Sequence, residues 1–179
     1  MVPVMNVLIA GCGYVGVRLA ERLQAAGHSV LGLRRSEPSP LPYLRWIRGD
    51  LAAKSMDPLP VPVDAVVLAA GLRRDAEERY RQLFMDGYDW LIREVLLRHP
   101  VRRLVMVSTT GVFAENDGGW VDESSPVKSD HAPGRYYLAA EDLVRQSSLP
   151  FSIVRLSGLY GPERFRLIRE VREGLARRH

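Results

Sequence analysis

A glycine-rich turn between an apolar strand and a helix constrains this chain more than any other stretch. The hexapeptide GCGYVG at residues 11–16 has the spacing G-x-G-x-x-G and directly follows an apolar run at residues 4–10. Residues 17–23 then place apolar side chains at the spacing of a helix that packs one face. The first glycine permits a tight turn, the second lets a phosphate approach the backbone, and the third lets the helix pack closely on the strand.

The same stretch has the context that a dinucleotide site requires. A second predicted strand, residues 28–33, follows Gly27, which is expected to end the helix. One βαβ unit thus closes within about thirty residues, and the unpaired N–H groups of the helix N-terminus would face an anion. We therefore predict dinucleotide binding, with a purely structural glycine turn as the alternative. The residues expected to contact the pyrophosphate are Gly11, Gly13, Tyr14, Val15 and Gly16.

The end of the second predicted strand bears on which dinucleotide fits. NAD-binding proteins usually have an Asp or Glu there, which accepts hydrogen bonds from the ribose hydroxyls. This chain has Arg34 and Arg35 followed by Ser36. Guanidinium groups bind a 2′-phosphate through charge-assisted, often bidentate hydrogen bonds. We therefore expect NADP, with NAD as second choice. The alternative is that both arginines lie in solvent before the proline-rich loop at residues 38–42.

Strands and helices alternate along the rest of the chain. Residues 54–62 contain three prolines and are interpreted as a connector, and residues 116–133 as a polar loop. The alternation predicts an α/β fold with a doubly wound parallel sheet, in which ligands lie beyond the carboxyl ends of the strands. Further strands are predicted at 44–48, 64–71, 101–107 and 150–156, and helices at 75–98 and 135–148, with an arginine-rich helical stretch at the end.

Composition excludes several other classes of protein. The 179 residues, 46% hydrophobic and 26% charged, suit one globular domain, and no apolar run approaches a membrane span. Cys12 is the single cysteine, which excludes an internal disulfide, leaves no metal-ligand cluster and suggests a packing role within the turn. The net charge of +4 comes from arginines scattered beside acids, so we expect solvated helix faces and no nucleic-acid binding. These features are typical of a cytoplasmic protein.

Several short motifs occur in a recognisable order along nearly the whole chain. Besides the glycine turn they are GDL at 49–51, AAG at 69–71, VSTTGVF at 107–113, VDExxP at 121–126 and RLSGLYGP at 155–162. In this order they resemble the extended and atypical short-chain dehydrogenases/reductases, specifically the NAD-dependent epimerase/dehydratase family. The last motif is the most specific, because an Arg before Tyr-Gly-Pro has no common structural explanation.

The resemblance implies how a dinucleotide would lie on the chain. Two residues would flank the adenine, Asp50 near its amino group and Leu51. A run of small residues would pass under the adenosine ribose and the pyrophosphate, namely Ala69, Ala70 and Gly71. The family's catalytic Ser or Thr corresponds to Thr109, whose hydroxyl would hydrogen-bond a substrate carbonyl or alcohol. The alternative for Thr109 is a polar residue that caps a strand end.

The chain departs from the family at its Tyr-x-x-x-Lys pair. In the family the Tyr shuttles a proton, and the Lys lowers the pKa of that Tyr and binds the nicotinamide ribose. Tyr136 and Tyr137 occupy the right region, but Ala140 and Glu141 stand four residues on. Aligning Glu141 with the family's acidic residue would put Pro133 and Tyr137 in the places of the pair. A neighbouring Glu would raise the pKa of a Tyr, which is the wrong direction for a base.

We therefore expect an NAD(P)-binding protein of epimerase/dehydratase type. It would pass a hydride between the nicotinamide and a secondary alcohol or ketone of a small molecule such as a nucleotide-sugar, with Thr109 polarising the oxygen and Tyr136 or Tyr137 donating the proton. The alternative is a non-catalytic dinucleotide sensor or scaffold. Residues 1–179 are interpreted as one Rossmann domain, either a fragment of a longer chain or a chain without a substrate lobe. The resemblance also implies a homodimer through helices 75–98 and 135–148.

Overall fold

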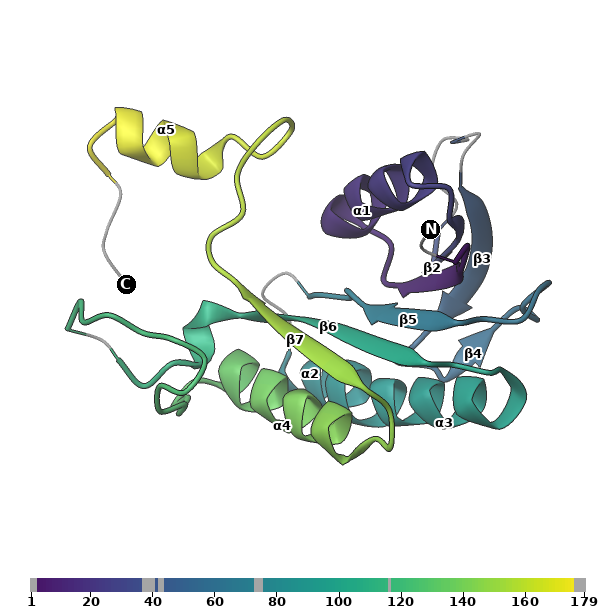
Figure 1. The fold of residues 1–179 in the computed structure, drawn as a ribbon. Coiled ribbons are helices and arrows are strands. Elements are labelled where there is room, and N and C mark those ends of the chain that lie inside the picture. Colours follow the sequence, from purple (N-terminus) through teal and green to yellow (C-terminus); the bar gives the residue numbers. More distant parts are fainter. Residues whose placement is uncertain (1–2, 37–40, 42–43, 73–75, 116, 176–179) are drawn as a thin grey trace.

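The computed structural model describes residues 3–36, 41, 44–72, 76–115 and 117–175 (Figure 1). Most of the predicted proline-rich loop at 38–42 lies outside the described residues. The same holds for Asp75, the first residue of the predicted helix at 75–98, and for Asn116, the first residue of the predicted polar loop at 116–133. Within the described part, no helix is both long enough and apolar enough to cross a membrane.

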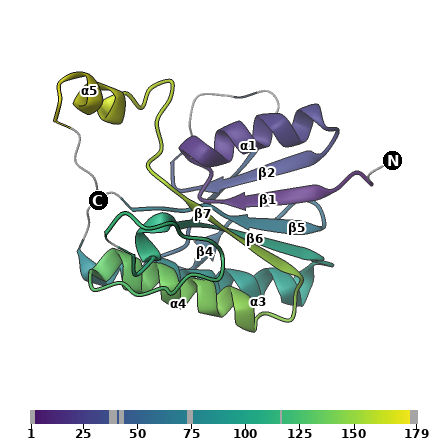
Figure 2. The ribbon, with the colours of Figure 1, turned by 60° about the vertical axis from the view of Figure 1, so that its left-hand side comes forward.

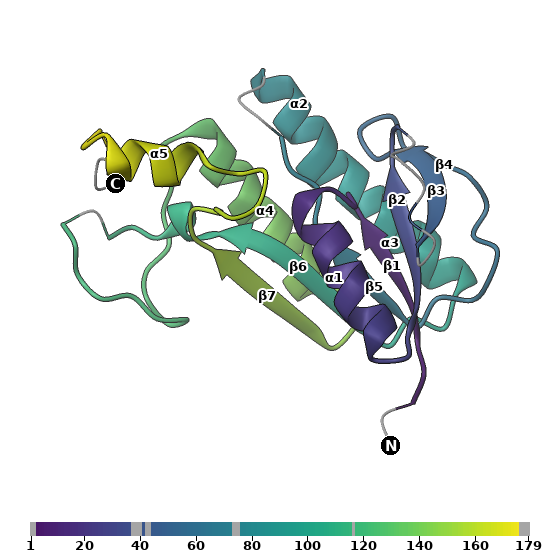
Figure 3. The same ribbon diagram turned by 90° about the horizontal axis from the view of Figure 1, so that it is seen from above.

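Seven strands form one sheet in the order β4-β3-β2-β1-β5-β6-β7. Every neighbouring pair is parallel except β3 and β4. Seen from above, β7 lies at one edge and β3 and β4 at the other (Figure 3). The predicted α/β fold with a doubly wound parallel sheet is confirmed. The strands are β1 Asn6–Ala10, β2 Ser29–Arg34, β3 Arg45–Asp50, β4 Ser55–Met56, β5 Ala65–Leu68, β6 Arg103–Thr109 and β7 Phe151–Leu156.

Strand β4 corrects the prediction that residues 54–62 form a connector without regular structure. Ser55 and Met56 pair antiparallel with Asp50 and Gly49. The prolines that argued against a strand begin only at Pro58, so Ser55 and Met56 both have the backbone N–H groups that a strand ladder needs.

The helices cover both faces of the sheet. Helix α1, Tyr14–Ala25, lies on one face, and α2, α3 and α4 lie on the other (Figures 1 and 2). The predicted helix at 75–98 is in fact three segments, α2 Glu77–Arg81, the π-helix η1 Gln82–Gly87 and α3 Tyr88–Arg98. At the end of η1, Gly87 packs on the turn after β3, where a Cβ would lie 2.5 Å from the carbonyl oxygen of Leu51.

Three further helical segments follow in the second half of the chain. They are the 3₁₀-helix η2 Thr110–Val112, α4 Ala132–Gln146 and α5 Arg166–Arg172. Helix α4 packs on β6 and β7. Helix α5 lies apart from the sheet and buries none of its residues (Figure 1).

The alternation of side chains along β1 divides the core into two layers. Leu8 belongs to the cluster under α3 and α4, whereas Val7 and Ile9 belong to the cluster under α1. All three are nearly or fully buried. A parallel sheet covered by helices on both faces requires such apolar runs, because neither side of its strands contacts water.

A buried carboxylate joins α4 to the last two strands. Glu141 is fully buried and accepts hydrogen bonds from Ser108 Oγ at 2.6 Å, from Arg155 Nε at 3.0 Å and Nη2 at 2.8 Å, and from Arg145 Nη2 at 2.8 Å. Burial opposes ionisation, but hydrogen bonds from Arg155, Ser108 and Arg145 outweigh it and keep the pKa of Glu141 below its usual value. Arg155 therefore has a structural partner, which corrects the view that its motif lacks a structural explanation.

We predict that Glu141→Gln destabilises the protein by about 3 kcal/mol, because it leaves the largely buried Arg155 guanidinium without its counter-charge. Urea unfolding followed by circular dichroism measures the loss. Asp142→Asn is the matched control, since Asp142 is the exposed neighbour of Glu141 and its carboxylate pairs with Arg145 at the surface. Equal unfolding midpoints for the two variants would contradict the assignment.

The lowered pKa of Glu141 also predicts a pH dependence. A carboxyl with a lower pKa in the folded protein stabilises the fold fully above its unfolded pKa, about 4.3, and loses that contribution as pH falls through the folded pKa. In urea midpoints measured from pH 7 down to pH 3, the wild type should therefore lose stability more steeply than Glu141→Gln. A constant gap between the two proteins over this range would refute the coupling.

Candidate functional site

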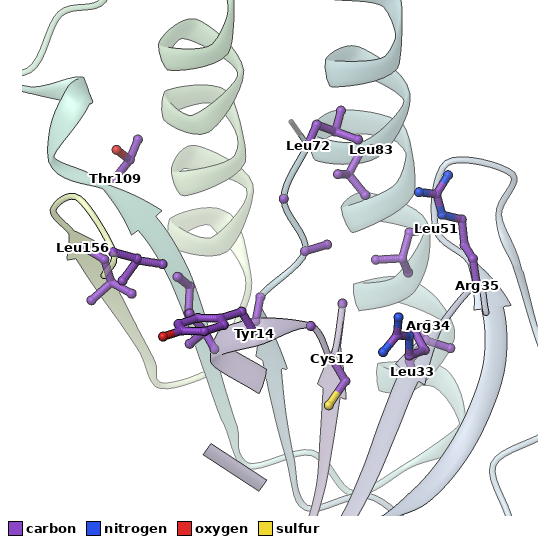
Figure 4. Close-up of a pocket in the computed structure, with 18 of the residues that line it drawn as sticks. Cys12, Tyr14, Leu33, Arg34, Arg35, Leu51, Leu72, Leu83, Thr109 and Leu156 are labelled. Atoms are coloured by element: carbon purple, nitrogen blue, oxygen red, sulfur yellow. The ribbon is translucent and has the colours of Figure 1, made fainter. Parts of the chain in front are cut away.

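A cavity of about 660 Å³ lies at the carboxyl ends of the parallel strands. We call this cavity the crevice. Its position agrees with the predicted ligand site beyond the strand ends. The two arginines that end β2 lie on one side of it and Thr109 lies on the other, with Cys12 and Tyr14 between them (Figure 4). Residues at or just after the ends of six strands contribute to its wall, namely Gly11, Arg34, Asp50, Ala69, Thr109 and Leu156.

The glycine-rich turn is fixed between the ends of two strands. The N–H groups of Gly11 and Cys12 both donate to the carbonyl oxygen of Leu33 at 3.0 Å. Gly11 has φ +83°, and a Cβ on it would overlap the backbone of Ala70. Only glycine fits both the backbone conformation and this contact.

The turn leaves the N-terminus of α1 uncapped. Gly13 precedes the helix, its residue type offers no side chain for capping, and the first turn has no acidic residue. The first N–H groups of a helix have no partner within the helix, so those of α1 remain available to a ligand. This combination of unpaired donors and a positive helix end suits an anion. Tyr14 and Val15, in the first turn, also line the crevice.

Cys12 packs inside the turn and is fully buried, as predicted. A Cβ on Gly16 would lie 3.0 Å from Ile9 Cγ2 and 3.2 Å from Cys12 Sγ, so the third glycine lets α1 approach β1. Burial raises the pKa of the Cys12 thiol to about 11, although Arg34 acts in the opposite direction. The thiol is therefore protonated at neutral pH and is a poor nucleophile.

Both arginines that end β2 line the crevice. Arg34 is half-buried, its Nη2 donates to Ser36 Oγ at 3.3 Å, and its guanidinium lies 5.6 Å from the ring centroid of Trp46. Arg35 is exposed but extends along the same wall (Figure 4). Both arginines thus lie at the wall of the crevice, and Arg35 is also open to solvent.

The expected adenine and ribose residues also line the crevice. Asp50 Oδ1 accepts a hydrogen bond from the N–H of Ala52 at 3.0 Å, which fixes its carboxylate at the turn after β3, and Leu51 is buried. Ala69, Ala70 and Gly71 continue from β5 beneath the glycine turn, and the Tyr88 hydroxyl donates to the carbonyl of Ala70 at 3.2 Å.

Thr109 ends β6 and faces the crevice. Its Oγ1 accepts a hydrogen bond from the N–H of Gly111 at 3.1 Å, which caps η2. The hydroxyl proton is still free to be donated, since a hydroxyl is both donor and acceptor. Thr109 thus both caps the start of η2 and faces the crevice.

The structure brings Thr109 and Tyr137 into one cavity but leaves Tyr136 outside it. The Tyr137 hydroxyl points toward Gly71, where an added Cβ would lie 3.7 Å away, and its ring packs 4.4 Å from that of Phe84. Burial, and then Tyr80, raise the pKa of Tyr137. At neutral pH Tyr137 is a hydrogen-bond donor rather than a base.

Tyr136 contacts a different acid from the one expected. Its hydroxyl lies 3.3 Å from Glu77 Oε1, and desolvation followed by Glu77 raises its pKa. The expected rise in Tyr pKa is present, but its causes are burial with Glu77 at Tyr136 and burial with Tyr80 at Tyr137. Glu141 does not cause it, and its carboxylate is bound by Arg155 and Ser108.

The loop after β7 adds residues that the sequence reasoning missed. The Arg18 Nη2 donates to the carbonyl of Pro162 at 3.3 Å, and a Cβ on Gly161 would lie 2.7 Å from the Tyr14 hydroxyl. Arg164 places its guanidinium 4.8 Å from the centroid of the Tyr14 ring and lines the crevice. Its only sequence signal is its position two residues after the Tyr-Gly-Pro motif.

The part of the chain that the structure describes contains no group of three or more His, Cys, Asp or Glu side chains that could bind a metal ion. The crevice wall includes the glycine-rich turn, hydroxyl groups and guanidinium groups, together with leucines and the carboxylates of Asp50 and Glu163. Such a lining suits a phosphate-containing ligand.

Comparisons with known proteins agree with this geometry. The model of the NAD dependent epimerase/dehydratase family matches residues 7–176. Protein YeeZ of Escherichia coli (strain K12) is 30% identical over 174 aligned residues, which cover 89% of this chain and 60% of YeeZ.

Two solved structures extend the comparison. One, assigned to the NAD-dependent epimerases/dehydratases and from Methylobacillus flagellatus, is 30% identical with a TM-score of 0.76, and the match covers 94% of this chain and 59% of that one. The other, MoeE5 in complex with UDP-glucuronic acid and NAD, is 25% identical with a TM-score of 0.77, and covers 92% of this chain and 60% of that one. The chain thus spans about 60% of the length of these relatives.

The burial of Cys12 predicts that a thiol reagent will not react with the native protein. In a colour assay with an aromatic disulfide reagent at pH 8, the folded protein should release almost no product, and the urea-unfolded protein should release one equivalent. Rapid release of one equivalent from the folded protein would show that the turn opens and that the thiol is exposed.

Proposed function

The chain belongs to the NAD-dependent epimerase/dehydratase family, and we propose that its crevice binds NAD(P), with NADP preferred over NAD. The main observation behind the proposal is the glycine-rich turn, which is fixed by Leu33 and Ala70 and followed by an uncapped helix end. A dinucleotide pyrophosphate is an anion that these N–H groups and the positive helix end can bind. MoeE5, a relative, was solved with NAD, which supports a dinucleotide as the ligand.

The proposed placement follows the walls of the crevice. The adenine would lie against Asp50 and Leu51, and the adenosine ribose beside Arg34 and Arg35. The pyrophosphate would lie over the turn, on Gly11, Gly13, Tyr14, Val15 and Gly16, with Ala69, Ala70 and Gly71 beneath it. This places the nicotinamide toward Thr109, on the side of the crevice opposite the two arginines (Figure 4).

The preference for NADP depends on this chain's own residues. The relative MoeE5 was solved with NAD, whereas this crevice has two guanidinium groups and no carboxylate at the end of β2. A 2′-phosphate would accept charge-assisted hydrogen bonds from Arg34 and Arg35, while the 2′-hydroxyl of NAD offers no negative charge to them.

We further propose a hydride transfer to or from a secondary alcohol or ketone of a small molecule such as a nucleotide-sugar. Bound NAD(P) supplies or accepts the hydride. Thr109 donates a hydrogen bond to the substrate oxygen, and Tyr137 supplies a second hydroxyl in the same cavity. The nucleotide-sugar class is supported by MoeE5, which was solved with UDP-glucuronic acid.

A non-catalytic dinucleotide sensor is the second candidate function. The raised pKa of Tyr137 makes it slow to exchange a proton at neutral pH. Neither lysine of the chain lines the crevice, and Lys128 pairs with Asp130 at 3.3 Å. The lysine of the family's proton relay therefore has no counterpart among the described residues of α4. That residues 1–179 form a single domain, and that the protein forms a homodimer, both stay predictions.

We predict that NADPH binds more tightly than NADH, and that Gly11→Ala abolishes the binding of both, because its Cβ would overlap Ala70. Titration followed by nucleotide fluorescence measures both affinities. Gly27→Ala is the matched control. It has a similar φ of +89° but no atom within 4 Å of the added Cβ, so it should bind like the wild type. If the wild type binds neither nucleotide at millimolar concentration, the proposed site is wrong.

If the protein is an enzyme, the loss of the Thr109 hydroxyl should lower turnover, whereas the loss of the Tyr136 hydroxyl should not. On a panel of carbonyl substrates with NADPH, Thr109→Ala should lower turnover by about 100-fold, since it removes a donor to the developing oxyanion. Tyr136→Phe should leave turnover unchanged, because its hydroxyl lies outside the crevice. Unchanged turnover in Thr109→Ala would remove this residue from the mechanism. Binding without turnover of any substrate would support the sensor.

A further inference from the structure

The end of β2 lies beside a third arginine that the dinucleotide motif does not predict. In the parallel pairing of β2 with β3, Arg34 lies directly opposite Arg48. Directly paired residues of neighbouring strands have their side chains on the same face of a sheet. That face is the one under α1, because Gly32, two residues before Arg34, packs on Trp46 and on Cys12.

This arrangement places like charges next to each other on neighbouring strands. Two cations directly opposite each other across a strand pair destabilise the sheet. Among the described residues, Arg34, Arg35 and Arg48 form no ion pair with a carboxylate. The side-chain contacts of Arg34 are the neutral Ser36 hydroxyl and the Trp46 ring. An anion between the guanidinium groups would remove the repulsion.

A second cavity connects Arg48 to the crevice. It has a volume of about 390 Å³, and it shares Arg35, Gly49 and Asp50 with the crevice. Arg48 lies in its wall. Two carboxylates also lie there. That of Asp50 is hydrogen-bonded to the N–H of Ala52, and Asp57 is exposed at the β4 edge of the sheet.

We propose that Arg48 completes a subsite for the 2′-phosphate of NADP, together with Arg34 and Arg35. The inference rests on the proposed function, because it requires the adenosine ribose to lie at the end of β2. A phosphate dianion at the junction of the two cavities would face Arg34 in the wall of the crevice and Arg48 in the wall of the second cavity. Arg48 is thus a specificity-determining residue, since the 2′-hydroxyl of NAD has no charge for it to bind.

The test compares Arg48→Gln with the wild type in titrations with NADPH and NADH. The loss of one charged hydrogen-bonding group should lower the affinity for NADPH by roughly tenfold and leave the affinity for NADH within about twofold of the wild type. Arg45→Gln is the matched control, because Arg45 is an exposed arginine of the same strand that lines neither cavity. It should change neither affinity. A titration with 2′,5′-ADP should show the same tenfold loss in Arg48→Gln, and one with 5′-AMP should not.

Stability of the unliganded protein gives an independent readout. Removal of Arg48 relieves the repulsion with Arg34, so thermal unfolding of unliganded Arg48→Gln should occur at or above the temperature of the wild type. If Arg48→Gln lowers the affinities for NADPH and NADH equally, or leaves the affinity for NADPH unchanged, the role of Arg48 is overturned but the proposed dinucleotide site is not. Failure of the wild type to bind either nucleotide would overturn the site and this inference together.

Discussion

The close contact between the glycine-rich turn and the ends of β2 and β5 determines how the rest of the site is arranged. Gly11 lies against Ala70, and its N–H shares the carbonyl of Leu33 with Cys12. A side chain at Gly11 would separate the turn from β5 and widen the crevice. Because the turn cannot move away, α1 begins directly over the strand ends, and its unpaired N–H groups face the space where a pyrophosphate is proposed to lie.

The opposite half of the crevice depends on a buried charge. Glu141 binds Ser108 of β6 and Arg155 of β7, so these strand ends and α4 are fixed relative to one another. Ser108 directly precedes Thr109, and Tyr137 lies one helical turn before Glu141 on α4. Glu141, which is not part of the dinucleotide motif, thus helps to position the hydroxyl groups of Thr109 and Tyr137 at the crevice. The free-energy cost of burying its carboxylate is offset by the four hydrogen bonds that it accepts.

The local structure around the glycine-rich turn was predicted well, because it depends on residues close together in the sequence. The spacing of three glycines, the strand before them and the helix after them lie within about twenty residues, and each has one physical purpose. The residues of α4 were predicted less well. Whether Tyr136 or Tyr137 faces the crevice depends on the rotation of α4 on the sheet. The Tyr137 ring packs on that of Phe84, which lies 53 positions earlier in the sequence, so no local pattern indicates this contact.

The amino-acid sequence by itself determined the parallel α/β fold, the order of its strands along the chain and the location of the dinucleotide motif, because these follow from the period of apolar residues and from the conformations that only glycine adopts. Only the tertiary structure decided the partners of the charged groups. It paired Glu141 with Arg155, placed Arg48 opposite Arg34 and brought Arg164 over Tyr14. These pairings depend on strand register and helix rotation, which long-range packing sets and no local pattern specifies.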